Sequence, residues 1–231
     1  GGSPCQGFSF ASSNRVNLDD PRSKLFWEFE RLLTELSPHF YLLENVLMDK
    51  ASEEVITKTL DIDPIEIDSA RLSAQTRKRL YWTNIPITGQ PPNLGLTCGD
   101  VFDLTVDRQV YPQEKIKTKW NTVNYLQYDV SGKGYKSQGF RAYKLNRKHG
   151  TLPSSRPGNK GQILMPNGDI AFLNADDWEI LQTVPVGYTN HVSETQRMHM
   201  LGNGWTVDVI AWILSFMQGE PRNGIAQSSL F

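Results

Sequence analysis

The sequence predicts an α/β fold, interrupted by a loop-rich lobe and completed by further helices. Helical and strand-like segments alternate up to about residue 85, the alternation stops over 86–171, and helical periodicity returns from 174 to 217. At 231 residues the chain is long enough for one core with a smaller appended lobe. Its 39% hydrophobic and 21% charged residues are typical of a globular protein rather than a disordered or fibrous one.

The first region alternates helices with short apolar runs. A helix is expected over 20–36, because Asp20 can cap it, Pro21 suits its first turn and Pro38 ends it. Its apolar positions follow a helical period: Leu25, Phe26, Phe29, Leu32, Leu33 and Leu36. A buried strand at 40–43, a helix at 52–60 and strands at 65–67 and 80–84 follow. This order is typical of a mostly parallel sheet.

The second region, 86–171, is rich in Gly, Pro, Asn, Lys and Tyr and has no helical period. We therefore expect a separate loop-rich lobe there. Helices are predicted at 174–182, capped by Asn174, at 193–201, stopped by Gly202, and at 206–217. The last helix has its apolar side at Val207, Ile210, Ile213, Leu214 and Met217. The predicted division is 1–85 and 172–231 as a core, with 86–171 between them.

The net charge of −1 hides an uneven distribution of charge along the chain. Residues 108–160 contain 12 Lys or Arg against Glu114 and Asp129 alone, so the rest of the chain is acidic. A basic lobe on an acidic body is the pattern expected of a nucleic-acid-binding surface. A solvated basic loop region is the alternative.

Several protein classes are excluded by the sequence. No apolar stretch approaches the roughly 18 residues of a membrane span, and no secretory signal is present, so no membrane partner is expected. Cys5 and Cys98 cannot form a disulfide framework, which favours a reducing compartment. The four histidines lack metal-ligand spacing, and no metal site is expected.

Three short motifs suggest a common active site. Pro4-Cys5-Gln6 lies in a Gly-rich loop, where backbone N–H groups can lower the pKa of a thiol. Glu44-Asn45-Val46 follows an apolar strand, and Gln75-x-Arg77-x-Arg79 precedes another. Either of these two motifs alone is more often a surface loop. All three together, with two at strand ends, favour an active site.

The three motifs resemble those of the cytosine-5 DNA methyltransferase family, and the resemblance covers nearly the whole chain. Residues 173–188 resemble the family's penultimate helix, and 202–207 its last motif. The closest likeness is to small phage and bacterial enzymes. It implies the later part of a Rossmann-like class I methyltransferase sheet with a target-recognition lobe, S-adenosylmethionine as cofactor and double-stranded DNA as partner.

The resemblance also assigns roles to residues. Cys5 attacks carbon 6 of a flipped-out cytosine, Glu44 acts on ring nitrogen 3, and Arg79 with Arg77 holds and braces the base. The cofactor contacts are Pro4, Gly202, Asn203 and Val207, and the DNA contacts are Gln6, Ser9, Gln75 and Arg141. We add Tyr125, Tyr128 and Tyr135 as residues near the bases. The cell compartment would be the cytoplasm of a bacterial or phage-infected cell, or a eukaryotic nucleus.

The sequence departs from the family at its start. The Gly-rich Phe-x-Gly-x-Gly loop and the acidic residue that hold the cofactor in family members have no counterpart here. We therefore expect a truncated sequence or, as the less favoured alternative, a second polypeptide that supplies the missing motifs. Two other functions stay open: an RNA cytosine-5 methyltransferase, and a catalytically silent module that binds DNA or a partner enzyme. The recognised DNA sequence and the role, whether restriction–modification, phage self-protection or regulation, are not given by the motifs.

Overall fold

The computed structural model describes residues 1–2, 24–134, 136–153 and 161–217. The chain forms two compact units. Unit 1 comprises residues 1–67, 78–90 and 211–231, and unit 2 comprises 68–77 and 91–210. Within the described residues, none of the helices is both long and apolar enough to cross a membrane.

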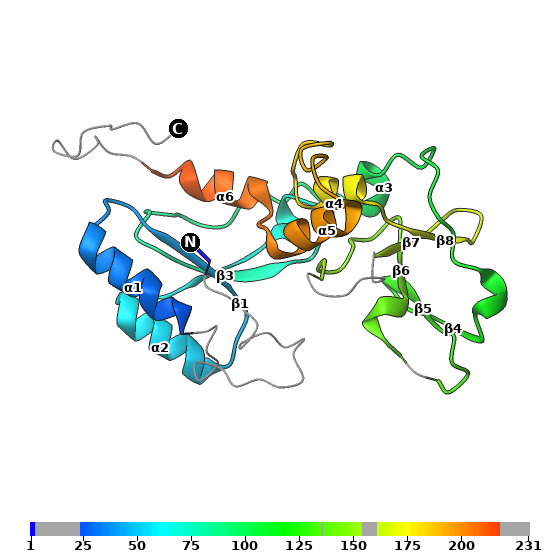
Figure 1. The fold of residues 1–231 in the computed structure, drawn as a ribbon, viewed down its shortest axis with the longest axis horizontal. Helices are drawn as coiled ribbons and strands as arrows, with labels where there is room; N and C mark the ends of the chain where they lie inside the picture. The colour runs from blue at the N-terminus through cyan, green and yellow to red at the C-terminus, as the bar shows by residue number, and fades with distance from the viewer. Residues whose placement is uncertain (3–23, 135, 154–160, 218–231) are drawn as a thin grey trace. The chain divides into compact units, whose positions relative to one another are not determined.

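Unit 1 is built around a three-stranded sheet of order β1-β3-β2, with β1 at Leu42–Val46, β2 at Ile65–Asp68 and β3 at Lys78–Thr83. Helices α1 (Leu25–Leu36) and α2 (Lys50–Leu60) lie next to each other beside this sheet (Figure 1). Phe26 of α1 and Ile56 of α2 are fully buried against Leu43 and Trp82 of the strands. The predicted strands and the helix α2 are present with ends shifted by a few residues, and α1 is present up to Leu36; the predicted helix start, with Asp20 and Pro21, lies outside the described residues.

The pairing of β1 with β3 is antiparallel, where the sequence predicted a mostly parallel sheet. The reason lies in the connection from β2 to β3. Residues 69–77 contain one 3₁₀ turn, Ser69–Arg71, and are too few for the crossover of a dozen or more residues that a parallel neighbour requires. The chain therefore turns back into β3, and Arg79 near the start of β3 lies at the same end of the sheet as Val46 at the end of β1.

The apolar face predicted for α1 is too wide. Phe26 is fully buried and Phe29 and Leu33 are partly buried, whereas Leu25, Leu32 and Leu36 are exposed. The core contact is thus a narrow stripe at i, i+3 and i+7. Ser37, at positive φ, closes the helix by donating its N–H to the Leu33 carbonyl, and Pro38 follows as predicted.

Unit 2 contains a five-stranded sheet of order β4-β5-β6-β7-β8 in the region predicted to be loop-rich. Its strands are Thr118–Asn121, Tyr125–Asp129, Arg141–Lys144, Gln162–Leu164 and Ile170–Phe172. No strand was predicted there, because each is only three to five residues long and Gly-rich turns separate them. Tyr128 is fully buried in the core of this sheet, and its hydroxyl donates to Gln162 Oε1 at 2.9 Å. Its prediction as a residue near the bases is therefore wrong.

The helices of unit 2 include α3 (Cys98–Val101), α4 (Ala175–Leu181) and α5 (Glu194–Asn203), while α6 (Val207–Leu214) runs from unit 2 into unit 1. Asn174 and Ser193 cap α4 and α5 through capping boxes, as predicted for Asn174. Helix α5 continues through Gly202 and ends at Asn203, so Gly202 does not stop it. In α6 the buried residues are Val209 and Ile213, while the predicted Val207, Leu214 and Met217 are exposed.

One cation of the basic segment is part of the core of unit 2. Arg108 and Asp177 are both buried and form a bidentate ion pair, with Nε–Oδ2 at 3.0 Å and Nη2–Oδ1 at 2.7 Å. Lys148 is also used internally, because its ammonium donates to the Ser73 and Leu96 carbonyls. The charge available to a partner is therefore smaller than the sequence count. Among the described residues of this segment, the exposed cations are Lys115, Lys117, Lys119, Lys133, Lys136 and Arg147.

Candidate functional site

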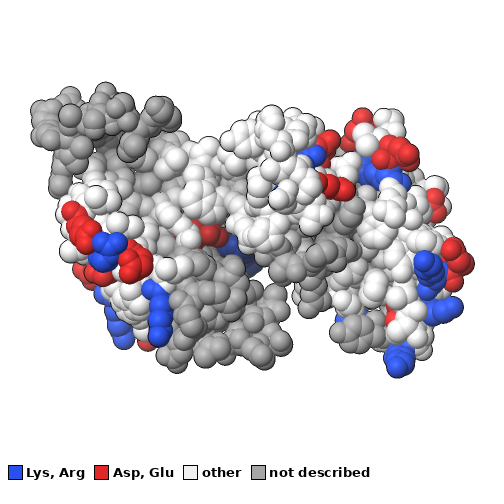
Figure 2. All heavy atoms as spheres, in the orientation of Figure 1, with Lys and Arg blue, Asp and Glu red and all other residues white. Residues whose placement is uncertain are grey.

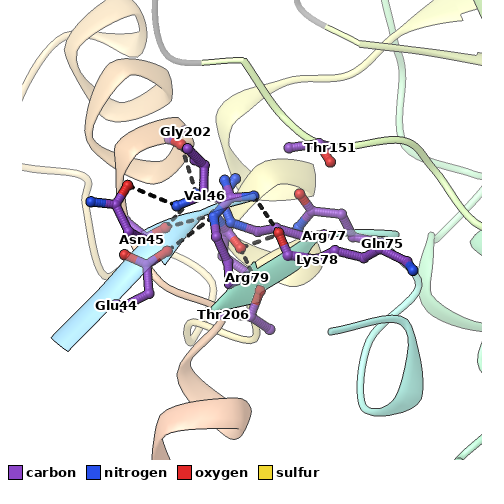
Figure 3. A network of polar contacts seen from close by, with 12 residues as sticks. Glu44, Asn45, Val46, Gln75, Arg77, Lys78, Arg79, Thr151, Gly202 and Thr206 are labelled. Carbon is purple, nitrogen blue, oxygen red and sulfur yellow. Dashed lines mark hydrogen bonds and ion pairs between the residues drawn. The ribbon is translucent and has the colours of Figure 1, made fainter. Parts of the chain in front are cut away.

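In unit 1 the motifs around residues 44 and 79 meet at one end of the sheet. Arg79 is paired in register with Val46, which places it diagonally across from Glu44 on the same face of the sheet. Arg79 Nε lies 3.0 Å from Glu44 Oε1, and each side chain is 13% exposed (Figure 3). Arg79 Nη1 also donates to the Lys78 carbonyl at 2.8 Å. This ion pair between two neighbouring strands thus holds a carboxylate and a guanidinium side by side at one end of the sheet.

The start of the chain runs along this strand. Gly2 forms a parallel bridge with Glu44, and the Glu44 N–H donates to the Gly1 carbonyl at 2.9 Å. The Gly1 amino group also donates to the Leu42 carbonyl. The predicted site residues Pro4, Cys5, Gln6 and Ser9 lie outside the described residues. They follow Gly2 directly in the sequence, and Gly2 is the strand partner of the carboxylate-bearing residue.

In unit 2, Arg77 caps the end of helix α5. Its side chain is buried, and Nη2 donates to the carbonyls of Gly202 and Gly204 at 3.0 and 2.8 Å (Figure 3). The last carbonyls of a helix have no partner within the helix, and a cation at this end is favoured by the helix dipole. The Arg77 N–H donates to Asp68 Oδ1 at 2.9 Å, which fixes the base of the side chain. Arg77 therefore braces the 202–204 turn.

A second buried group, Gln182, holds the same turn. Its Nε2 donates to the Leu201 and Gly204 carbonyls, and its Oε1 accepts from Thr206 Oγ1 at 2.9 Å. The Val207 N–H donates to the Gln182 carbonyl at 2.9 Å, so the start of α6 is held too. Gln182 and Thr206 lie within the stretches 173–188 and 202–207 that resemble family motifs, but neither was predicted as a site residue, because no sequence pattern indicates a hydrogen bond between side chains 24 residues apart.

Gln75 belongs to this network as well. Its side chain has no exposed surface, its Nε2 donates to the Leu181 carbonyl and to Gln182 Oε1, both at 3.1 Å, and its Oε1 accepts from the Leu152 N–H at 3.0 Å. Burial and these three bonds do not favour a direct contact with DNA, which remains an untested prediction. Through these hydrogen bonds, Gln75 connects the segment 68–77 to the end of helix α4.

The residues predicted to contact the cofactor in the last motif differ in exposure. Gly202 is buried, whereas Asn203 is exposed and Val207 keeps 44% of its surface. Asn203 Nδ2 donates to the His199 carbonyl at 3.1 Å, one turn back in α5. The braced turn therefore presents one amide and one apolar side chain to the outside of unit 2.

Cys98 is not a competing nucleophile. It is fully buried in the core of unit 2, and burial raises the pKa of its thiol to about 12. A thiol with that pKa is protonated at neutral pH, and only the thiolate is a good nucleophile. Cys98 therefore packs as an apolar side chain in the core of unit 2.

Of the predicted residues near the bases, Tyr125 and Arg141 lie together on β5 and β6. The Arg141 guanidinium lies 4.9 Å from the centre of the Tyr125 ring. Tyr125 also lines an open pocket of about 470 Å³ in unit 2, together with Tyr143, Arg147 and His149. Tyr135 lies outside the described residues.

Comparison with known proteins agrees with the sequence motifs. Residues 1–61 match the family described as C-5 cytosine-specific DNA methylase. DNA (cytosine-5)-methyltransferase DRM2 of Oryza sativa subsp. japonica is 30% identical over 210 residues, covering 85% of this chain and 34% of the relative. The Type II methyltransferase M1.ScrFI of Lactococcus lactis subsp. cremoris is 26% identical over 236 residues, covering 91% of this chain and 59% of the relative. The chain thus spans about a third of the first relative and three fifths of the second.

The fold is also found among solved structures. The Entamoeba histolytica methyltransferase EhMeth superposes with a TM-score of 0.68 over 94% of this chain and 75% of that one, at 16% identity. At this identity the likeness concerns the fold, and it confirms the α/β methyltransferase class predicted from the sequence.

Proposed function

We propose that this chain carries the catalytic and target-recognition part of a DNA cytosine-5 methyltransferase. Residues 1–61 match the family of C-5 cytosine-specific DNA methylases, and the two methyltransferases compared above are similar to most of the chain. The observation that supports this best is the Glu44–Arg79 pair. Gly2, three residues before Cys5, forms a strand bridge with Glu44, which is the acid of this pair.

The chemistry assigns a separate task to each of these side chains. Cys5 as thiolate adds to carbon 6 of cytosine, and the ring electrons released make carbon 5 nucleophilic. Glu44 donates or shares a proton at ring nitrogen 3, which draws electron density through the ring, and Arg79 fixes the position of that carboxyl group. After carbon 5 gains its methyl group and loses its proton to a base, the S–C6 bond breaks and Cys5 leaves.

S-adenosylmethionine supplies the methyl group in this proposal. The described residues fit it in part: Asn203 offers an exposed amide and Val207 an exposed apolar surface, on a turn that Arg77 and Gln182 hold rigid. Pro4, which the resemblance also assigns to the cofactor, lies outside the described residues. A further segment or a second polypeptide would supply the Gly-rich motif on the other side.

The DNA partner would contact unit 2. A base inside a duplex cannot be reached by these side chains, so the target cytosine is flipped out of the stack. Exposed lysines on and near β4, among them Lys117 and Lys119, suit the phosphate backbone. Figure 2 shows lysine and arginine side chains on the surface around β4 and β5, with acidic side chains among them.

The test is methyl transfer by the protein together with the polypeptide that carries the cofactor motifs. Labelled S-adenosylmethionine is offered with duplex DNA or with folded RNA, and bisulfite sequencing locates the product. We expect 5-methylcytosine in DNA, lost in Glu44→Gln and retained in the matched control Glu66→Gln, whose carboxylate forms an exposed ion pair with Lys78. Product in RNA alone would overturn the DNA assignment, and an equally active Glu44→Gln would overturn the role of Glu44.

A further inference from the structure

Two buried glutamine side chains form a continuous chain of hydrogen bonds through unit 2. Gln75 Nε2 donates to Gln182 Oε1 at 3.1 Å, and neither side chain has exposed surface. At one end of the chain, Gln182 Nε2 donates to the carbonyls of Leu201 and Gly204. At the other end, Gln75 Oε1 accepts from the Leu152 N–H at 3.0 Å. The two amides thus connect residue 152 to the turn at the end of helix α5.

Backbone groups at both ends fix the direction of the two amides. The Leu201 and Gly204 carbonyls can only accept, so the Gln182 atom that faces them is the nitrogen. The Leu152 N–H can only donate, so the Gln75 atom beside it is the oxygen. Turning either amide over would place oxygen against oxygen and nitrogen against nitrogen. The chain therefore has one arrangement, in which each amide orients the next.

The backbone on both sides of Gln75 is bound to a second segment of unit 2. The His149 N–H donates to the Ala74 carbonyl, and the Thr76 N–H donates to the His149 carbonyl, both at 2.8 Å. Thr151 Oγ1 donates to the Thr76 carbonyl, also at 2.8 Å. A displacement of this second segment therefore moves the backbone of Gln75 together with its side chain.

The second segment, residues 147–152, lies beside open space, and we call it the pocket segment. Its first four residues and Thr76 line the open pocket of about 470 Å³. The segment also packs closely on the pocket wall, because a Cβ at Gly150 would lie 2.1 Å from the Tyr143 hydroxyl. Arg147 is exposed and offers a cation to a phosphate group of the DNA backbone. A ligand in this pocket would therefore touch the segment that holds Gln75.

We propose that Gln75 and Gln182 are positioning residues that couple DNA binding at the pocket segment to S-adenosylmethionine binding at the 202–204 turn. DNA on the pocket segment would restrict the movement of Gln75 and, through Gln182, of the turn. A cofactor that binds a turn already held loses less conformational entropy, so each ligand tightens binding of the other by the same factor. This inference rests on the proposed function and adds a means by which one ligand favours the other.

The two glutamines allow coupling to be separated from bracing of the turn. Gln182 holds the turn directly, whereas Gln75 acts on it through Gln182. Gln75→Met therefore interrupts the chain and leaves the bonds from Gln182 to the turn in place, while Gln182→Met removes both. Gln162→Met is the matched control, because Gln162 is also buried in unit 2 but bonds the Tyr128 hydroxyl and the Gly139 carbonyl instead.

The test measures binding of S-adenosylhomocysteine, which has no methyl group to transfer. Its Kd is determined for the enzyme reconstituted with the polypeptide that carries the cofactor motifs, without DNA and with a saturating duplex that the wild-type enzyme selects from a random library. We expect the duplex to tighten binding about 5- to 150-fold in the wild type and in Gln162→Met. In Gln75→Met the Kd without DNA should stay close to the wild-type value, and the tightening should be lost. The double variant with Gln182→Met should show no further loss of tightening, because both changes break the same chain.

Hydrogen exchange gives a second readout that does not require the cofactor. The Val207 N–H donates to the Gln182 carbonyl at 2.9 Å. DNA should slow exchange of this N–H in the wild type and leave it unchanged in Gln75→Met. Thr151→Val changes an exposed residue and removes only the bond to the Thr76 carbonyl, so it should reduce the tightening without a risk to folding. If Gln75→Met loses cooperative unfolding in urea, this milder variant decides.

The inference is overturned if DNA leaves the Kd of S-adenosylhomocysteine unchanged in the wild type. It is also overturned if Gln75→Met, or Thr151→Val in its place, keeps the full tightening and the slowed exchange. Each of these results can occur with methyl transfer to DNA intact, and the proposed function would then stand. An enzyme that binds neither the duplex nor S-adenosylhomocysteine would contradict the proposed function and the inference with it.

Discussion

Replacing Arg77 with Met tests whether this arginine braces the 202–204 turn. The change keeps much of the apolar stem and removes the two hydrogen bonds from Nη2 to the Gly202 and Gly204 carbonyls, at 3.0 and 2.8 Å. Hydrogen bonds to charged groups contribute about 1.5–3 kcal/mol each, and the loss is partly offset because a buried charge disappears as well. We therefore expect the free energy of unfolding to fall by about 2–3 kcal/mol.

The measurement is urea unfolding of the variant beside Lys78→Met, its neighbour in sequence. Lys78 forms an exposed ion pair with Glu66, and such a pair is worth about 0–1 kcal/mol. In the enzyme reconstituted with the polypeptide that carries the cofactor motifs, Arg77→Met should raise KM for S-adenosylmethionine more than KM for DNA. The reason is that the 202–204 turn carries Asn203, the proposed cofactor contact. A variant of wild-type stability, or one that raises KM for DNA alone, would refute the bracing role.

Two further predictions concern stability. Arg108→Met leaves Asp177 as a buried charge without its partner, so we expect a loss of about 3–5 kcal/mol in urea unfolding; a loss below 1 kcal/mol would show that the pair is solvated. His149 is buried, and desolvation lowers its pKa from 6.5 to about 4, so the unfolded chain takes up its proton first as the pH falls. Stability should therefore decrease from pH 6.5 toward pH 4 by up to about 3 kcal/mol, and His149→Gln should remove that part of the slope; identical pH profiles would contradict the assignment.

The features that the sequence predicted correctly are determined by residues that lie close together along the chain. Asn174 was identified as a cap because its side chain bonds an N–H three residues away, and Pro38 was identified as a stop by its own ring. The antiparallel pairing of β1 with β3 was missed because it depends on the length of a connection rather than on any residue pattern. Gly202 was misjudged because Arg77, 125 residues earlier, takes the carbonyl at that helix end.

In the candidate site, too, the sequence motifs identified residues, whereas the contacts between those residues depend on the tertiary fold. The motifs placed Glu44 and Arg79 in one site, but only the register of two strands brings their side chains to 3.0 Å. Tyr125 and Tyr128 looked alike in the sequence; they lie on opposite faces of β5, so the first lines a pocket and the second is core. A strand recognised at 125–129 would have separated them by its two-residue period.

The central claim is that Cys5 is the nucleophile, and a covalent trap tests it most directly. Duplex DNA containing 5-fluorocytosine in the target site is incubated with the reconstituted enzyme and S-adenosylmethionine, because fluorine at carbon 5 prevents the step that releases the enzyme. Mass spectrometry of the digested adduct should identify the peptide that contains Cys5, and Cys5→Ser should form no adduct. An adduct on Cys98, whose thiol is buried with a pKa raised to about 12, or an adduct formed by Cys5→Ser, would contradict the account.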